Sequence, residues 1–109
     1  MAAIVNLNIN YGASWVFQAT FPIELDLSGA LVDVEVLPAA DSPSSEALLK
    51  FSTANKINIT GQVVSFNITS KLLINSLLPN DYYWRLFIKY ANGIRDNVMS
   101  GNFIFRDSV

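Results

Sequence analysis

Apolar and polar residues alternate with a period of two along most of this sequence, and no other feature constrains the fold as strongly. Tyr82, Trp84 and Leu86, for example, alternate with Tyr83 and Arg85. Because successive side chains of a strand point to opposite faces, the pattern predicts half-buried strands rather than helices. We expect seven or eight strands, at 4–10, 14–21, 30–37, 48–53, 57–60, 63–69, 81–90 and in a last segment through Phe103 and Phe105.

The segments between the expected strands carry turn signals. Gly61-Gln62 predicts a tight hairpin with glycine at its first central position, and Asn92-Gly93 predicts another because both residues tolerate positive φ. The stretch 41–46 is rich in serine and acidic residues and is expected to be an exposed, mobile loop. Only 70–78 breaks the alternation, and there Ser70 is expected to cap one or two helical turns.

Many short strands with turns between them indicate an all-β protein, either an antiparallel β-sandwich or a small barrel. The chain has 109 residues and a mass of 12.0 kDa, which is the size of one domain. We therefore expect a single domain over 1–109, without room for βαβ crossovers.

Composition excludes several classes of function. Seven Lys and Arg against nine Asp and Glu give a net charge of -2, so no basic field attracts nucleic acid or an anionic membrane. The sequence has no His and no Cys, which removes the usual nucleophile and base pairs, the imidazole and thiolate metal ligands, and disulfides. We expect no enzymatic activity and no cofactor.

The apolar residues are distributed in short runs. No run approaches the roughly 20 residues needed to cross a bilayer, and no basic residue precedes an apolar stretch at the amino end, so we expect soluble protein made in the cytosol. Hydrophobic residues nevertheless make up 51% of this short chain, and charged residues only 15%. Since a small domain cannot bury so much apolar surface by itself, we expect some of it to contact another chain.

Two pairs of carboxylates are candidates for chemistry. Asp33 and Glu35 share one face of an expected strand, and Glu24 and Asp26 have the same spacing before a turn. Either pair could in principle serve sugar hydrolysis or bind calcium. Neither belongs to a recognisable calcium loop, and so short a chain does not easily build a long cleft. A solvated strand face and a turn with exposed acids are the favoured interpretations, and no catalytic or metal-binding residue is predicted.

The densest aromatic cluster lies at 82–90. Alternation sends Tyr82, Trp84 and Tyr90 toward the core and leaves two aromatic and two basic side chains on the other face. That mixture favours a protein interface, whereas a sugar-binding aromatic platform remains the alternative. The predicted interface lies on the strands that begin near Leu31 and Asp81, and it consists of Tyr83, Arg85, Phe87, Lys89, Asp33 and Glu35.

Four segments carry a resemblance to a known family. They are Gly12-Ala13-Ser14-Trp15-Val16-Phe17, Leu25-Asp26-Leu27-Ser28-Gly29-Ala30-Leu31-Val32, Leu77-Leu78-Pro79-Asn80-Asp81-Tyr82-Tyr83-Trp84, and Asn92-Gly93 followed by Ser100-Gly101-Asn102-Phe103. In this order they resemble immunoglobulin-like β-sandwich domains of the baseplate, tail and fibre-anchoring proteins of tailed bacteriophages. The likeness covers nearly the whole chain, although Tyr11 and Ala13 replace the basic and acidic residues that flank the family's early glycine.

The resemblance implies an immunoglobulin-like β-sandwich that is a structural protein of a phage particle, assembled in the host cytoplasm. Its partners would be further copies of itself, in a closed symmetric arrangement, and other virion proteins of the tail, baseplate or fibre attachment. A small-molecule ligand is not expected. A capsid decoration or cement protein and a module that binds host glycans are the alternatives. No fibre segment follows Val109, so the module is expected to stand alone.

Overall fold

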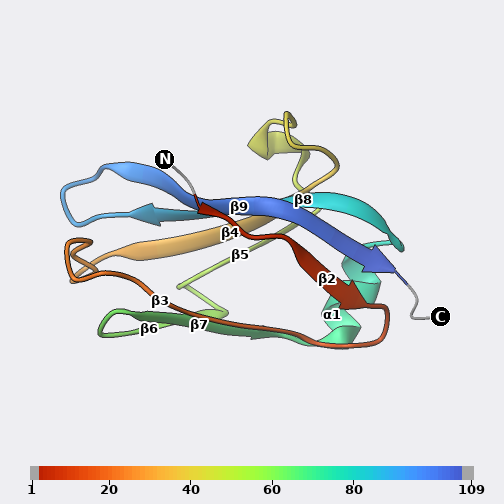
Figure 1. Cartoon of the computed structure of the whole chain (residues 1–109), viewed down its shortest axis with the longest axis horizontal. Helices are drawn as coiled ribbons and strands as arrows, with labels where there is room; N and C mark the ends of the chain where they lie inside the picture. The colour runs from red at the N-terminus through yellow and green to blue at the C-terminus, as the bar shows by residue number, and fades with distance from the viewer. Residues whose placement is uncertain (1–2, 107–109) are drawn as a thin grey trace.

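The computed structural model describes residues 3–106 and places them in two β-sheets packed face to face (Figure 1). Sheet A has the strand order β1-β9-β8-β4-β5, with β2 also paired to β9, and sheet B has the order β3-β7-β6. The strands are β1 (Ala3–Ile4), β2 (Leu7–Asn10), β3 (Trp15–Thr20), β4 (Leu31–Leu37), β5 (Leu49–Ser52), β6 (Ile57–Thr60), β7 (Val63–Ile68), β8 (Asn80–Lys89) and β9 (Arg95–Arg106). The helices are η1 (Ser44–Glu46) and α1 (Ser70–Ser76). The all-β prediction is confirmed, and of the two architectures the molecule adopts the sandwich.

The core lies between the sheets and is centred on Trp15. Its indole is 1% exposed and meets four aromatic rings at centroid distances of 4.7 to 5.7 Å. Those rings are Phe51, Phe66, Trp84 and Phe103, which come from both sheets. Tilted and edge-to-face pairs of this kind contribute about 0.5–1.5 kcal/mol each beyond their area burial. The inward rows predicted from alternation, including Tyr82, Trp84 and Leu86 on β8, are buried as expected.

The amino-terminal segment departs from the predicted antiparallel arrangement. The expected strand 4–10 is divided into β1 and β2, and both pair with β9 in parallel. Between them the Val5 carbonyl accepts a hydrogen bond of 2.8 Å from the Trp84 indole N–H. A Cβ at Gly101 would lie 2.1 Å from that same carbonyl oxygen, so only glycine admits the crossing. The parallel pairing of β1 and β2 with β9 thus depends on contacts between residues far apart in the chain, which the local alternation of apolar and polar residues does not encode.

Both predicted hairpins form, with one difference in turn type. Gly61 has a φ of 60°, which is the left-handed region expected at the first central position. In the second hairpin Gly93 has a positive φ of 90°, but Asn92 does not, since no non-glycine residue in 3–106 has a positive φ. The Tyr90 carbonyl accepts from the Gly93 N–H at 2.9 Å, and the Tyr90 N–H donates to the Ile94 carbonyl at 2.8 Å. This is a three-residue loop that ends in a left-handed glycine, not the two-residue turn predicted.

One further local prediction is corrected, and another is confirmed except at one residue. The helix begins one residue earlier than expected, because the Thr69 hydroxyl, not that of Ser70, caps it by accepting from the Leu72 N–H at 3.3 Å. The loop 41–46 is largely exposed, as expected, but Ser42 is 7% exposed and its hydroxyl accepts from the Ala39 N–H at 3.2 Å. The loop lies over Glu35 and Arg85 of sheet A, which form hydrogen bonds with Ser44 and Ser42.

Candidate functional site

The outward side chains of sheet A form the candidate site, and we call this surface the outer face. Register assigns it unambiguously, since Glu35 lies opposite Arg85 and Lys50 on the neighbouring strands. The face consists of Leu31, Asp33, Glu35, Lys50, Ser52, Tyr83, Arg85, Phe87, Lys89, Arg95, Asn97, Ser100 and Asn102. All six residues predicted for an interface belong to it.

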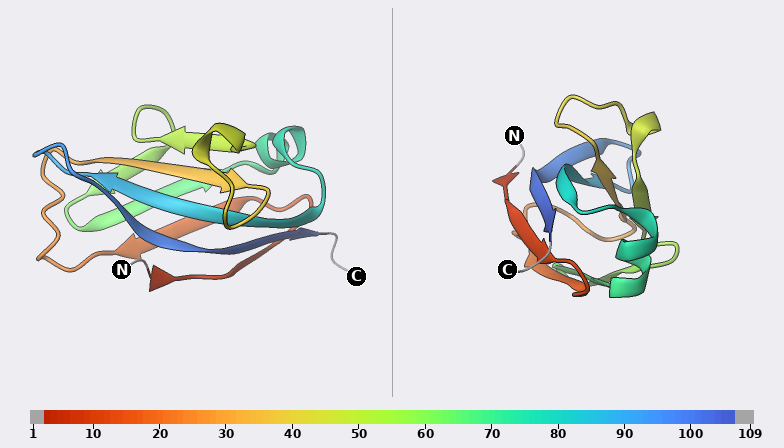
Figure 2. Two further views of the ribbon diagram at one scale, coloured as in Figure 1. Left: turned by 90° about the horizontal axis from the view of Figure 1, so that it is seen from above. Right: turned by 90° about the vertical axis from the view of Figure 1, so that its right-hand side faces the viewer.

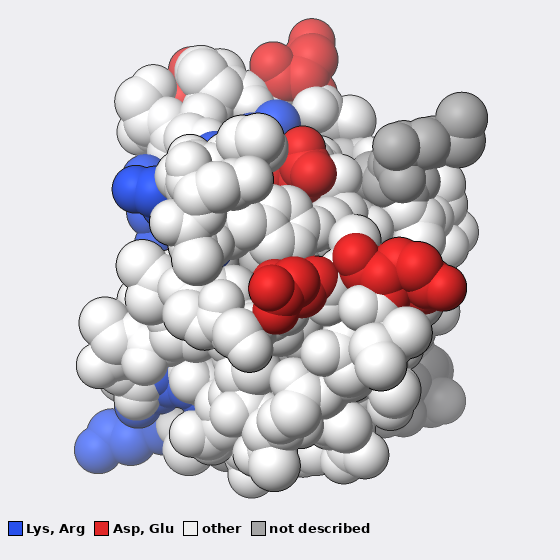
Figure 3. Space-filling view, turned by 90° about the vertical axis from the view of Figure 1, so that its left-hand side faces the viewer, with Lys and Arg blue, Asp and Glu red and all other residues white. Residues whose placement is uncertain are grey.

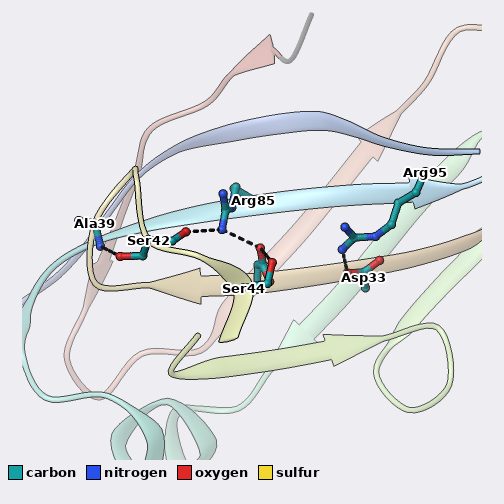
Figure 4. A network of polar contacts seen from close by, with 7 residues as sticks. Asp33, Ala39, Ser42, Ser44, Arg85 and Arg95 are labelled. Atoms are coloured by element: carbon teal, nitrogen blue, oxygen red, sulfur yellow. Dashed lines mark hydrogen bonds and ion pairs between the residues drawn. The ribbon is translucent and has the colours of Figure 1, made fainter. Parts of the chain in front are cut away.

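A buried ion pair anchors the middle of the outer face (Figure 4). Arg85 Nη2 lies 3.0 Å from Glu35 Oε1, and the two side chains are 18% and 3% exposed. The same nitrogen donates to the Ser42 carbonyl at 2.9 Å, and the Ser44 hydroxyl donates to Glu35 at 2.9 Å. The loop before β5 thus closes over the pair and supplies two of its hydrogen bonds, while the buried Nε of Arg85 has no partner among the described residues. Removing one partner of such a pair is costly, because the other charge stays buried without compensation.

The prediction of a solvated strand face is therefore wrong for Glu35. Alternation correctly pointed its side chain away from the core, but the loop that contains Ser42 and Ser44 covers it. Asp33, two residues earlier, remains 38% exposed. Glu35 cannot contact a partner unless this loop moves.

A second cluster lies on the open part of the outer face. The guanidinium carbon of Arg95 lies 3.7 Å from the centroid of the Phe87 ring, and Arg95 Nη2 donates to Asp33 Oδ2 at 2.6 Å. Cation–π contacts at exposed sites contribute about 0.5–1 kcal/mol. The ion pair is 42% and 38% exposed, so solvent screens it and its own contribution is at most about 1 kcal/mol. The cluster fixes one arginine and one aromatic ring on an accessible surface.

Arg95 reaches this position because β9 contains a bulge. Leu86 pairs with Met99, whereas the next residue, Phe87, pairs with Asn97, so one residue of β9 is extra. The insertion reverses the inward and outward alternation along β9. Arg95 and Ser100 consequently share the outer face although their numbers differ in parity. Sequence reasoning missed Arg95, because the two-residue turn predicted at Asn92-Gly93 would place it opposite inward-facing Tyr90. The three-residue loop instead places it opposite Lys89.

The remaining predicted interface residues lie at the two ends of the face. The Tyr83 hydroxyl donates to the Ser100 hydroxyl at 3.3 Å, and the side chain is half-buried. Lys89 is exposed and lies opposite Leu31, which is 57% exposed. The structure thus joins Asp33 with Phe87 and Glu35 with Arg85, and leaves Tyr83 and Lys89 apart. Their role in an interface stays a prediction.

The aromatic side chains do not form a flat platform for sugar rings. Both tryptophans are buried, Trp15 at 1% and Trp84 at 0% exposure, and one face of Phe87 is occupied by the Arg95 guanidinium. Tyr83 is the remaining half-exposed ring of the outer face. The geometry gives the glycan-binding alternative no support.

A small acidic hollow occupies the end of the molecule that carries the β8–β9 hairpin. Glu24, Asp26 and Asp96 line it together with Tyr90, and Figure 3 shows acidic side chains gathered on this end while basic ones lie toward its margin. Burial, with a smaller effect of the Asp96 charge, raises the pKa of Tyr90. Asp26 Oδ1 accepts from the Ser28 N–H at 3.0 Å, as in a turn. Over residues 3–106, no three acidic side chains come close enough to hold a metal ion.

Comparisons with protein-family models, with curated proteins and with solved structures found no match to this chain. No helix within residues 3–106 is long and apolar enough to cross a membrane.

Proposed function

We propose that this chain is a non-enzymatic structural module of a tailed-phage particle, an immunoglobulin-like sandwich that acts through contacts with copies of itself and with other virion proteins. The strand order supports the immunoglobulin-like assignment. In the variable type of that fold, one sheet contains the strands G, F, C and C′, and the other contains B, E and D. Here β9-β8-β4-β5 and β3-β7-β6 have the same connectivity.

A tyrosine at the start of β8 supports the same assignment. The Tyr82 hydroxyl donates to the Leu78 carbonyl, four residues earlier, which is the geometry of the tyrosine corner in immunoglobulin domains. In antibody domains a disulfide cysteine follows this tyrosine by two residues, and here that position is Trp84. Trp84 meets Trp15 of β3 at 5.7 Å and 90°. An indole pair therefore joins the sheets where antibodies use a disulfide.

The observation that carries the interface proposal is the fixed Arg95–Phe87 pair on the open part of the outer face. Arginine and aromatic residues are enriched at protein interfaces, and side chains already held in place lose less entropy on binding. Exposed Leu31 and Lys89 border the pair. The phage context rests on the four sequence segments that resemble tail, baseplate and fibre-anchor domains. Capsid decoration is the same kind of function at another place in the particle.

The first test is the mass of the purified protein by light scattering over a tenfold range of concentration. A Phe87→Ala, Lys89→Glu variant is expected to lower the mass of any oligomer, because it removes the ring under Arg95 and reverses an exposed charge. Lys71→Glu, on an exposed residue of α1, is the matched control. Arg85 is unsuitable as a probe, since its substitution would unpair buried Glu35. Unchanged assembly by the double variant would remove the outer face from the proposal.

The virion context is tested separately. Phage particles separated by density from the source culture are expected to contain the chain in a fixed ratio to their major structural proteins. Detection of the chain in the soluble fraction alone would contradict a structural role in the particle.

A further inference from the structure

Strand β3 forms one edge of sheet B, and its backbone is paired on one side only. The Phe21 N–H donates to the Gln62 carbonyl at 2.8 Å, so residue 21 belongs to a hydrogen-bonded pair of the β3–β7 ladder. Such pairs alternate along an antiparallel ladder. The odd-numbered residues of β3 therefore direct their backbone groups toward β7, and Val16, Gln18 and Thr20 direct theirs outward.

Those outward groups are available for pairing. Within residues 3–106, no hydrogen bond from another element reaches the backbone of Val16, Gln18 or Thr20. All three side chains are exposed, Val16 at 70%. Figure 2 shows the amino-terminal strands of sheet A, in red, running beside β3, in orange, on the same side of the sandwich.

The β3 edge lacks the features that normally prevent pairing between molecules. Proteins protect edges with charged side chains, proline, bulges or very short strands. β3 has six residues and an unbroken register with β7, and it contains neither a charge nor a proline. The other edges differ, because β5 carries Lys50, β6 is short and follows Lys56, and the β1–β2 edge is interrupted.

The side chains of β3 are complementary to a second copy of β3. In an antiparallel pair about a two-fold axis, outward residues must oppose outward residues, and the register centred on the strand places Gln18 opposite itself. Val16 then opposes Thr20, so two pairs of small branched side chains flank a pair of amides. On the inner side Phe17 opposes Ala19, a large residue against a small one, and both are half-buried in the monomer.

We propose that β3 pairs antiparallel with β3 of a second copy of this chain, about a two-fold axis through Gln18, and joins the two B sheets into one. The outward side chains of sheet B carry no charge, so the joined surfaces do not repel each other. They are Val16, Gln18, Thr20, Asn58, Thr60, Val63, Ser65 and Asn67. The second copy is thus expected to bind through backbone hydrogen bonds of β3, in the register that places Gln18 opposite Gln18. The inference does not rest on the outer face of sheet A or on the phage context.

Cross-linking tests the register directly. Opposed residues in a hydrogen-bonded pair have Cα atoms about 5.5 Å apart, within the range that a disulfide spans. The chain has no cysteine, so any disulfide of a Gln18→Cys variant joins two molecules. We expect this variant to oxidise to a dimer of twice 12.0 kDa much faster than Asn58→Cys, which is also at an exposed position, on β6. A mixture of Val16→Cys and Thr20→Cys should cross-link faster than either variant alone.

A charge at the axis tests the energetics without cysteine chemistry. Gln18→Lys would bring two ammonium groups together in the dimer but leave the monomer's ladder to β7 intact. We expect light scattering to show dimers at the upper end of the concentration range, since one strand pair buries less than a standard interface of about 1,600 Å². Gln18→Lys should weaken the dimer about fivefold, and Asn58→Lys should not.

Three results would overturn the proposal: a monomer at every concentration, equal cross-linking of Gln18→Cys and Asn58→Cys, or a dimer that Gln18→Lys leaves intact. Oligomers that respond to Phe87→Ala, Lys89→Glu but not to Gln18→Lys would support the outer face of sheet A alone. The two interfaces can therefore fail independently.

Discussion

The two sheets share one core, yet their outward faces are chemically opposite. Sheet A carries three ion pairs on its outward side, Arg85–Glu35, Arg95–Asp33 and Arg106–Asp81, and a loop seals the first of them. The strands of sheet B contain no charged residue at all. Period-two alternation therefore determines only which residues face the core. The chemical type of the outward residues determines what each sheet can bind. Sheet A offers fixed side chains, and sheet B offers an uncharged face with a free backbone edge.

The largest expected effect is a difference in stability between two glycine-to-alanine variants, one in each sheet. Gly101→Ala should destabilise the protein by about 3–5 kcal/mol, because its Cβ would meet the Val5 carbonyl at 2.1 Å and displace the segment that pairs with β9. Gly61→Ala, in the sheet B hairpin, has open space around its Cβ and should cost only the left-handed penalty of about 1–2 kcal/mol. Urea unfolding of both variants measures the difference. Equal losses would mean that the crossing at Gly101 is not tight.

The second effect concerns the sealed ion pair. Arg85→Met should destabilise the protein by about 3 kcal/mol, since Glu35 would stay buried with only the Ser44 hydroxyl as a partner. A Glu35→Leu, Arg85→Met double variant should recover most of this loss, because no charge is left buried. Ser65→Val at the centre of sheet B is the control and should change stability by at most about 0.5 kcal/mol. A double variant as unstable as the single one would contradict this account.

The third effect is the dependence of stability on pH in alkaline solution. Burial raises the pKa of Tyr82 and of Tyr90 above 10.0, and Asp96 adds to the effect at Tyr90. The folded state therefore keeps protons that the unfolded chain loses, and the stability from both groups is present below pH 10 and is lost as pH rises through their folded pKa values. Sheet B has no titratable side chain in its strands and cannot contribute.

Thermal unfolding from pH 8 to 11 measures this loss, and Tyr90→Phe should make the decline shallower. Asp96→Asn should do so to a smaller degree, because the Asp96 charge is the lesser cause of the shift at Tyr90. A decline that neither variant changes would place the alkaline sensitivity outside the end of the molecule that contains Tyr90.

The smallest effect tests the exposed ion pair of the outer face. Asp33→Asn should cost less than about 1 kcal/mol, because solvent screens a pair whose side chains are 42% and 38% exposed. The difference from the wild-type protein should shrink further in 1 M salt, where the Debye length is about 3 Å. A larger, salt-independent loss would mean that Asp33 also fixes Arg95 over Phe87 in a way that stability requires.

Much of the sheet structure could be predicted because its causes are local. Alternation along β8 assigned Tyr82, Trp84 and Leu86 to the core, and the glycines at 61 and 93 marked both hairpins. The six residues of the predicted interface share one face for the same reason, since β4 and β8 are adjacent strands, whereas their role in an interface stays a prediction. Arg95 escaped prediction because its position opposite Lys89 depends on a three-residue hairpin loop, and because the bulge in β9 then changes which residues share its face.

The sequence by itself determined the all-β class, the inward rows, the hairpins and the absence of charge from sheet B, because each follows from residue type and spacing within a few positions. Only the tertiary structure decided that β1 and β2 run parallel to β9, that a loop closes over Glu35, and that β3 is an edge with a free backbone. These features depend on contacts between residues far apart in the chain. In the crossing at Gly101, for example, the Trp84 indole holds the Val5 carbonyl, and neither residue specifies its partner locally.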